Sequence, residues 1–228
     1  MKALLTEIFD FILPRICPSC NSKLLPEETA ICSSCFSRIK IAEEDRITFE
    51  FRKKFEGKNI ISGFASMFIF EKDKEIQHII HSIKYSQRFL NGMFLGKIMS
   101  LFIEDKINAW KIDLLIPVPL HSVKKAERGF NQSYYISKGI SRNFKIPVDE
   151  KSLKRKRYTQ SQTTMNLIER QENIKDAFKV KHKKIIAGKN ILLIDDVITT
   201  GATVAECGRI LLENGAKSVY AASIAIAD

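Results

Sequence analysis

The chain has 228 residues, 45% of them hydrophobic, and carries a net charge of +11. A chain of this size and composition can bury a real core, and suits one medium domain or one domain with a small module. No apolar run approaches the roughly eighteen residues of a membrane span, so we expect no transmembrane segment.

Positive charge is concentrated in the middle of the chain. Residues 111–190 hold 19 Lys and Arg against 7 Asp and Glu, a net charge of +12. Such a zone attracts phosphates, either on a small ligand or on nucleic acid. The alternative is a genome that uses lysine freely, in which case the charges only solvate the surface.

The N-terminal residues 3–13, ALLTEIFDFIL, have the length of a signal-peptide core. Glu7 and Asp10 interrupt the apolar stretch and no small-residue cleavage site follows, so we reject that interpretation. The remaining apolar positions fall on one helical face. We expect a short amphipathic helix packed on the protein's own core, with a membrane surface or a partner as the alternative.

Four of the five cysteines form two closely spaced pairs. The pairs are Cys17 with Cys20 (CPSC) and Cys32 with Cys35 (CSSC). A spacing of two residues within each pair suits thiolates that converge on one tetrahedral Zn²⁺. A disulfide framework or a redox pair is the alternative, but a disulfide framework needs an oxidising compartment and we find no export signal.

We therefore expect a structural zinc module in residues 1–45 and a larger domain in residues 46–228. Because a module of this size has too little hydrophobic core to fold alone, the metal would supply its stability. The fifth cysteine, Cys207, lies in a helix pattern and is expected to be a small buried hydrophobe.

The larger domain alternates strand and helix patterns. Strand followed by helix and strand, with apolar strands buried on both faces, predicts an α/β fold with a parallel sheet and helices on both faces. The basic, polar residues 151–173 predict a long mobile loop leading into a helix. The other expected elements are a β-rich segment at 60–70, helix at 74–102 broken near Asn91 and Gly92, strands at 112–121, 190–195 and 218–227, a loop entering a helix at 128–144, and a helix at 203–216.

The stretch ILLIDDVITTGATVAE, residues 191–206, ends an apolar strand with two acids, Asp195 and Asp196. The loop that follows enters a helix, whose N-terminus offers N–H groups and a partial positive charge to a phosphate. Carboxylates beside a phosphate make sense if vicinal hydroxyls, or a metal bound to them, must also be held. The pattern thus predicts a ribose 5-phosphate ligand; the alternative is a solvated acid pair before a threonine-rich cap. The loop consists of Thr199, Thr200, Gly201, Ala202 and Thr203.

The segment ILLIDDVITTGAT resembles the phosphoribosyl-pyrophosphate (PRPP) signature of type I phosphoribosyltransferases. The resemblance implies a Rossmann-like parallel sheet, with Asp195 and Asp196 on the ribose hydroxyls, residues 199–203 on the 5-phosphate, and Mg²⁺ bound with PRPP. Pro117, Val118 and Pro119 stand where that family's pyrophosphate loop follows a strand, and residues 154–162 where its mobile catalytic loop lies.

A wider set of motifs is similar to the ComF family of competence proteins. The motifs are the four-cysteine knuckle, IPVPLH, ERGFNQ at 127–132, and RYTQSQTTMNLIERQENIKDAF at 157–178. Ser161 and Met165 depart from a frequent Pro and Leu. The resemblance implies a cytoplasmic protein of DNA uptake and natural transformation that contacts single-stranded DNA and a competence helicase, with attachment to the inner-membrane surface as a variant.

Two arginines are candidate catalytic residues. Arg128 follows the Pro-rich strand end, and its guanidinium suits a bidentate grip on pyrophosphate. Arg157 ends the run Lys154–Arg157, which can close over a pyrophosphate or follow a DNA backbone. A solvated surface charge is the alternative for both. His78 and His81, three residues apart on a helix face, would allow a metal but have no third ligand nearby.

These patterns leave three functions open. The preferred one is a PRPP-binding protein of the DNA-uptake machinery. The second is an active phosphoribosyltransferase, in which Arg128, residues 154–157 and Mg²⁺ stabilise the departing pyrophosphate. Purine-salvage relatives carry an Asp where this chain has Thr199, so the sequence names no acceptor. The third is a scaffold that recruits a helicase or a membrane partner.

Overall fold

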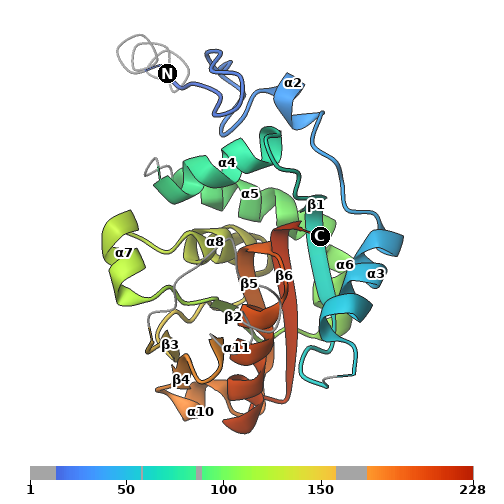
Figure 1. Cartoon of the computed structure of the whole chain (residues 1–228), viewed down its shortest axis with the longest axis vertical. Helices are drawn as coiled ribbons and strands as arrows, with labels where there is room; N and C mark the ends of the chain where they lie inside the picture. Colours follow the sequence, from blue (N-terminus) through green and yellow to red (C-terminus); the bar gives the residue numbers. More distant parts are fainter. Residues whose placement is uncertain (1–13, 58, 86–88, 158–173, 228) are drawn as a thin grey trace.

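The computed structural model describes residues 14–57, 59–85, 89–157 and 174–227 (Figure 1). A parallel four-stranded sheet in the order β1–β6–β5–β2 forms its centre, which confirms the predicted parallel α/β architecture. The strands are β1 (Phe64–Ile69), β2 (Leu114–Pro117), β5 (Asn190–Ile198) and β6 (Ser218–Ile226).

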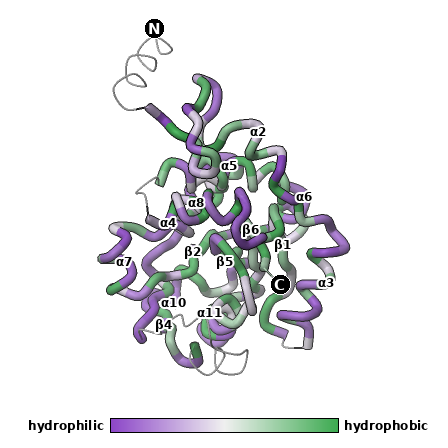
Figure 2. Tube along the Cα trace, turned by 45° about the horizontal axis from the view of Figure 1, so that its top comes forward, coloured by the Kyte–Doolittle hydropathy of each residue, from purple (hydrophilic) through white to green (hydrophobic). Residues whose placement is uncertain are grey.

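The central strands are apolar throughout because both faces of the sheet are covered. On β5, Leu192 and Ile194 join the hydrophobic cluster of one face, whereas Ile191 and Leu193 join that of the other. Figure 2 shows the contrast between these hydrophobic strands and the hydrophilic helices α3 and α7 at the periphery.

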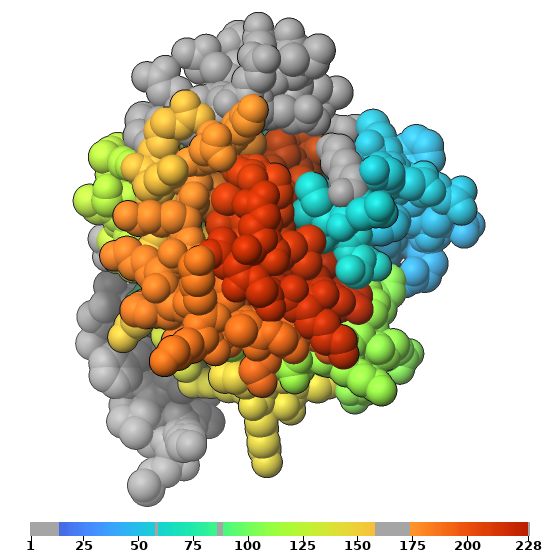
Figure 3. Space-filling view, turned by 90° about the horizontal axis from the view of Figure 1, so that it is seen from below, coloured from blue at the N-terminus to red at the C-terminus, as the bar shows by residue number. Residues whose placement is uncertain are grey.

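Different elements cover the two faces of the sheet. Helices α4 (Glu75–Tyr85), α5 (Phe89–Phe102), α6 (Glu104–Trp110) and α8 (Gln132–Phe144) contribute to the first cluster. The second cluster takes residues from α3 (Glu44–Phe55), α10 (Lys183–Ile186), α11 (Ala202–Glu213) and the antiparallel hairpin of β3 (Leu153–Arg155) and β4 (Phe178–Val180). Seen from below, α11 lies beside residues 174–189, and α3 lies on its other side (Figure 3).

Two glycines bring α5 and α8 unusually close. A Cβ added at Gly96 would collide with the carbonyl of Ile136, and one added at Gly139 would collide with the carbonyl of Met93. The predicted helix break near Asn91 and Gly92 is therefore wrong, because α5 runs through both residues. The two glycines allow the helices to pack closely. The first helix of this segment, α4, ends at Tyr85, and α5 begins at Phe89.

Three other expectations need correction. The strand expected to end at Asp195 continues to Ile198, so both acids lie within β5. The strand expected at 112–121 is shorter, β2 ending at Pro117, and the helix α7 (Ser122–Arg128) covers residues to which the sequence gave almost no prediction. The polar segment expected to be a loop contains β3, whereas residues 158–173 lie outside the described part of the chain. The expected N-terminal amphipathic helix also lies outside it.

The cysteine-containing segment packs on the α4 side of the sheet (Figure 1). It includes the short helix α2 (Ser33–Phe36), and its Leu24, Ile31 and Ile39 share the hydrophobic cluster of α4 and α5. Its end joins β1 through the bonds Ala42 N–H to Met67 O, 3.0 Å, and Ile69 N–H to Lys40 O, 3.0 Å. None of the helices in the described ranges is long and apolar enough to cross a bilayer.

The α5–α8 contact predicts a sharp response to one methyl group. In Gly96→Ala, the new Cβ must push α8 away, so the free energy of unfolding should fall by about 1–3 kcal/mol. Urea unfolding measures the change. The matched control is Lys97→Ala, at the exposed neighbouring position, which should shift it by less than about 0.5 kcal/mol. Equal stability of the two variants would contradict the close contact.

Candidate ribose-phosphate site

The acid pair lies near the carboxyl end of β5 and is held by short local bonds. Asp195 Oδ1 accepts from the hydroxyl of Ser133 at 3.1 Å and from the N–H of Asp196 at 2.9 Å. Asp196 is 5% exposed, and its Oδ1 accepts from the N–H of Val197 at 2.8 Å. Ser133 lies in the first turn of α8, so that helix fixes the orientation of Asp195.

A lysine from α4 offsets the charge of this pair. Lys84 Nζ lies 2.6 Å from Asp196 Oδ2, with the lysine side chain 23% exposed. Burial, together with the neighbouring Asp196 carboxylate, raises the pKa of Asp195 to about 7. Two carboxylates this close resist ionising together unless a cation stands beside them. The sequence pattern gave no role to Lys84.

The threonine loop leads from β5 into the N-terminus of α11. Gly201 has φ +74° and is buried, and a Cβ there would meet the Phe55 ring at 2.8 Å. Both observations explain the glycine. Thr200 Oγ1 accepts from the N–H of Ala202 at 3.3 Å, while Thr199 is exposed and Thr203 half-buried. The loop therefore places threonine hydroxyls next to the first N–H groups of α11, and both kinds of group can bind a phosphate.

A buried ion pair on α3 lies against the residues that flank this loop. Lys54 Nζ lies 2.5 Å from Glu50 Oε2, and both side chains are almost fully buried. The same ammonium donates to the Ala227 carbonyl at 3.0 Å, and Ala227 N–H donates to the carbonyl of Ile198, just before the loop, at 2.9 Å. The sequence reading missed these residues, because helix α3 gave no motif.

The predicted pyrophosphate loop lies on the neighbouring strand, at the same end of the sheet. Pro117 pairs with Ile194, and the three residues Pro117, Val118 and Pro119 are buried. Val118 N–H donates to the Ile194 carbonyl at 2.9 Å, and the Asn131 side-chain amide donates to the Val118 carbonyl at 3.0 Å. The sheet thus brings these three residues beside the acid pair.

Cations from three elements gather around this end of the sheet. Arg128 ends α7, donates to Gln132 Oε1 at 3.1 Å and to the Tyr85 hydroxyl at 3.4 Å, and lies 5.2 Å from the centre of the Tyr85 ring. Partial burial lowers the pKa of Lys124, and the nearby charges of Arg128, Arg155 and Lys84 lower it further. We call Lys84, Lys124, Arg128 and Arg155 the cationic cluster.

Arg157, the second predicted catalytic residue, lies two residues past the end of β3, on the side of the connection to β4. Its guanidinium donates to the Lys175 carbonyl at 2.8 Å. Lys156, Arg157, Lys175 and Asp176 line an open depression there. The basic residues Lys154 and Arg155 belong to β3, which makes them part of a strand rather than of a loop.

The four cysteine sulfurs converge on one point. The Sγ atoms of Cys17, Cys20, Cys32 and Cys35 all lie within 4.8 Å of one another. Sulfurs around one tetrahedral Zn²⁺ lie about 3.8 Å apart, given a Zn–S distance of about 2.3 Å. The Cys20 and Cys32 sulfurs are 3.7 Å apart, far beyond a disulfide length of about 2.05 Å. The donor set therefore fits a zinc ion.

The expected burial of Cys207 is confirmed, since its side chain is fully buried in α11. His78 and His81 lie on an exposed face of α4.

Comparisons with known proteins agree with this geometry. Residues 131–227 match the phosphoribosyl transferase domain family. This range contains α8, β5 and α11, and with them Ser133, the acid pair and the threonine loop. The part of the parallel sheet and its helices that holds the candidate site therefore matches the phosphoribosyl transferase domain family, and a four-cysteine module precedes it.

The curated relatives are named DNA utilization proteins and competence proteins. DNA utilization protein YhgH of Escherichia coli O157:H7 is 33% identical over 62% of this chain and 63% of its own length. Competence protein F of Haemophilus influenzae is 30% identical over the same shares. Competence protein ComFC of Bacillus subtilis is 26% identical over 88% of this chain and 79% of its own.

The chain is thus a homologue of the competence proteins F and ComFC. Its match spans just under two thirds of the length of the YhgH and competence protein F relatives.

The Lys84–Asp196 ion pair can be tested through stability. Lys84→Gln leaves a buried carboxylate without its cation, so the free energy of unfolding should fall by about 1–3 kcal/mol. The matched control is Lys40→Gln, which breaks an ion pair whose lysine is 65% exposed, and should change it by less than about 1 kcal/mol. Urea unfolding compares the two variants, and equal losses would contradict a stabilising role of Lys84.

Proposed function

We propose that this chain binds PRPP or a related ribose 5-phosphate at the acid pair and the threonine loop. The observation that carries the proposal is the presence of both groups at one end of the sheet, on consecutive parts of β5 and α11. Asp195 and Asp196 would accept hydrogen bonds from the ribose hydroxyls. The hydroxyls of Thr199, Thr200 and Thr203 and the first N–H groups of α11 would hold the phosphate.

The pyrophosphate of such a ligand would lie against Pro117, Val118 and Pro119 and the cationic cluster. Arg128 and Lys84 supply charge-assisted hydrogen bonds to phosphate oxygens. Arg157 would approach from the β3–β4 hairpin. Mg²⁺ bound with the ligand would neutralise part of the pyrophosphate charge. The acid pair, the threonine loop and the cationic cluster together suit this ligand better than a lone phosphate, which two carboxylates would repel.

We also propose a cytoplasmic role in DNA uptake, with contact to single-stranded DNA and to a competence helicase. The printed names of the relatives, DNA utilization and competence proteins, support the process. The net charge of +12 in residues 111–190 supports contact with a polyanion.

Transfer of the phosphoribosyl group to an acceptor is a second candidate function. It is favoured by the cationic cluster, which is placed to stabilise a departing pyrophosphate. Release of pyrophosphate from PRPP in the presence of purine, pyrimidine or amine acceptors would support transfer, and its absence with every acceptor would leave binding alone.

Calorimetry tests the ribose-phosphate site. The wild type should bind PRPP in Mg²⁺ buffer, and Asp195→Asn/Asp196→Asn should lose at least about a hundredfold in affinity, because two charge-assisted acceptors are gone. A matched control removes another adjacent acidic pair, in Glu104→Gln/Asp105→Asn on the exposed face of α6, and should bind as the wild type does. Equal affinity of both variants would sink the proposed site.

The four cysteines are proposed to hold a structural Zn²⁺ in a module of residues 1–45, distinct from a phosphoribosyltransferase domain of residues 46–228. Atomic absorption should find one zinc ion per chain. Cys32→Ser should lose it and lower the melting temperature, since metal binding contributes directly to folding. Cys207→Ala, which removes the one cysteine outside the cluster, should keep the full zinc content. Zinc loss in both variants, or in neither, would contradict this assignment.

A further inference from the structure

Helix α4 presents a row of exposed rings that the ribose-phosphate site does not use. His78, His81 and Tyr85 are all exposed, and their spacing of three and four residues places them on one face of the helix. The rings of His81 and Tyr85 are 4.5 Å apart between centres, at an interplanar angle of 38°. From His78 to Tyr85 the row extends about 10 Å, at 1.5 Å per residue.

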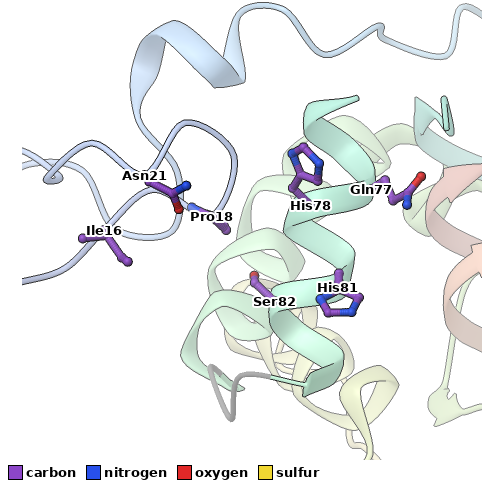
Figure 4. A pocket seen from close by; sticks show the side chains of 7 residues that line it. All are labelled: Ile16, Pro18, Asn21, Gln77, His78, His81 and Ser82. Carbon is purple, nitrogen blue, oxygen red and sulfur yellow. The ribbon is translucent and has the colours of Figure 1, made fainter. Parts of the chain in front are cut away.

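One end of the row opens into a pocket between α4 and the cysteine knuckle (Figure 4). The pocket has a volume of about 420 Å³. His78 and His81 line it from α4, together with Asn21 of the knuckle, whereas the Gln77 amide oxygen accepts from the N–H of Asp73 at 2.8 Å. Imidazole rings offer stacking faces, and the Asn21 amide offers a donor and an acceptor, which are the groups that read the edge of an unpaired base.

The other end of the row meets the cationic cluster. The Arg128 guanidinium lies over the Tyr85 ring, 5.2 Å from its centre, and Lys124 lies near Arg128 and Lys84. Rings and cations therefore follow one another along a single path, from the pocket to the acid-pair end of the sheet. Proteins that bind single strands combine these two features, because bases stack on rings while phosphates pair with cations.

We infer that this α4 face is the surface that binds single-stranded nucleic acid. Bases stack on His81 and Tyr85, one base enters the pocket beside His78, and phosphates contact Lys124 and Arg128. The inference rests on the DNA-contact part of the proposed function and adds the surface to it. A duplex keeps its bases stacked inside, so it can use the cations but not the rings. The strand would reach Lys124 and Arg128, which the proposed function also gives to the pyrophosphate, so the two proposed ligands would share these cations.

Fluorescence anisotropy with a fluorescein-labelled oligothymidylate of roughly 16 nucleotides tests the surface. His81→Ala/Tyr85→Ala should weaken binding by about tenfold or more, because two stacking faces are lost. Tyr85→Phe keeps the ring and removes only the hydroxyl that Arg128 contacts, so its affinity should stay within about twofold of wild type. Thermal melts of each variant confirm that it is folded.

The matched control is Phe49→Ala. Phe49 is 56% exposed on α3, and the cationic groups of Arg46 and Lys53 lie over its ring. Helix α3 lies away from α4 (Figure 1). Its loss should leave the affinity within about twofold. A larger loss in Phe49→Ala than in the double variant, or an unchanged double variant, would overturn the inference.

Photo-crosslinking locates the strand independently of affinity. An oligonucleotide that carries 5-iodouracil should crosslink to His81 or Tyr85, as mapped by mass spectrometry, and crosslinks confined to other elements would overturn the inference. Equal affinity for a duplex would do the same. If the wild type binds no oligonucleotide at low salt, the DNA part of the proposed function fails with it, whereas PRPP calorimetry reports separately on the ribose-phosphate part.

Discussion

Two adjacent carboxylates at the end of β5 impose the constraint on which much of this structure depends. Buried like charges are unfavourable unless cations and hydrogen-bond donors surround them. Here the donors come from three elements, namely Lys84 of α4, Ser133 of α8 and the backbone of β5 itself. The position of α8 in turn depends on its glycine contact with α5. The fold thus supplies a cation and several hydrogen-bond donors to the acid pair, at the end of the sheet where the threonine loop begins.

The same helix joins the site to the cysteine module. One end of α4 carries Lys84, while its buried Ile76 and Ile79 share a hydrophobic cluster with Leu24 and Ile31 of the module. Arg38 of the module also pairs with Glu75 at 2.6 Å. Anything that loosens the module therefore acts on the helix that supplies the cation of Asp196. If the proposed site binds its ligand, this connection would give the four cysteines a structural role in binding without placing them in the site.

Sequence reasoning predicted what local pattern encodes. The apolar runs gave the parallel strands, and the order of acids, hydroxyls and glycine gave the loop at the start of α11. It could not find Lys84, or the Lys54–Glu50 pair below the loop, because these contacts join elements distant in the chain. It also misread Gly92 as a helix break, since a glycine that admits a neighbouring helix has the same letter as one that ends a helix. The predictions from sequence therefore failed at residues whose role depends on contacts between elements distant in the chain.

The central claim is that the acid pair and the loop at α11 form one ribose-phosphate site. Titration of ribose 5-phosphate into ¹⁵N-labelled protein tests it most directly, because glycine amides are readily resolved and report position. The amide of Gly201 should shift together with that of Thr203, while those of Gly188, before the start of β5, and Gly215, past the end of α11, should stay unchanged. Shifts confined to other amide signals, with that of Gly201 unchanged, would show that this loop does not hold the phosphate.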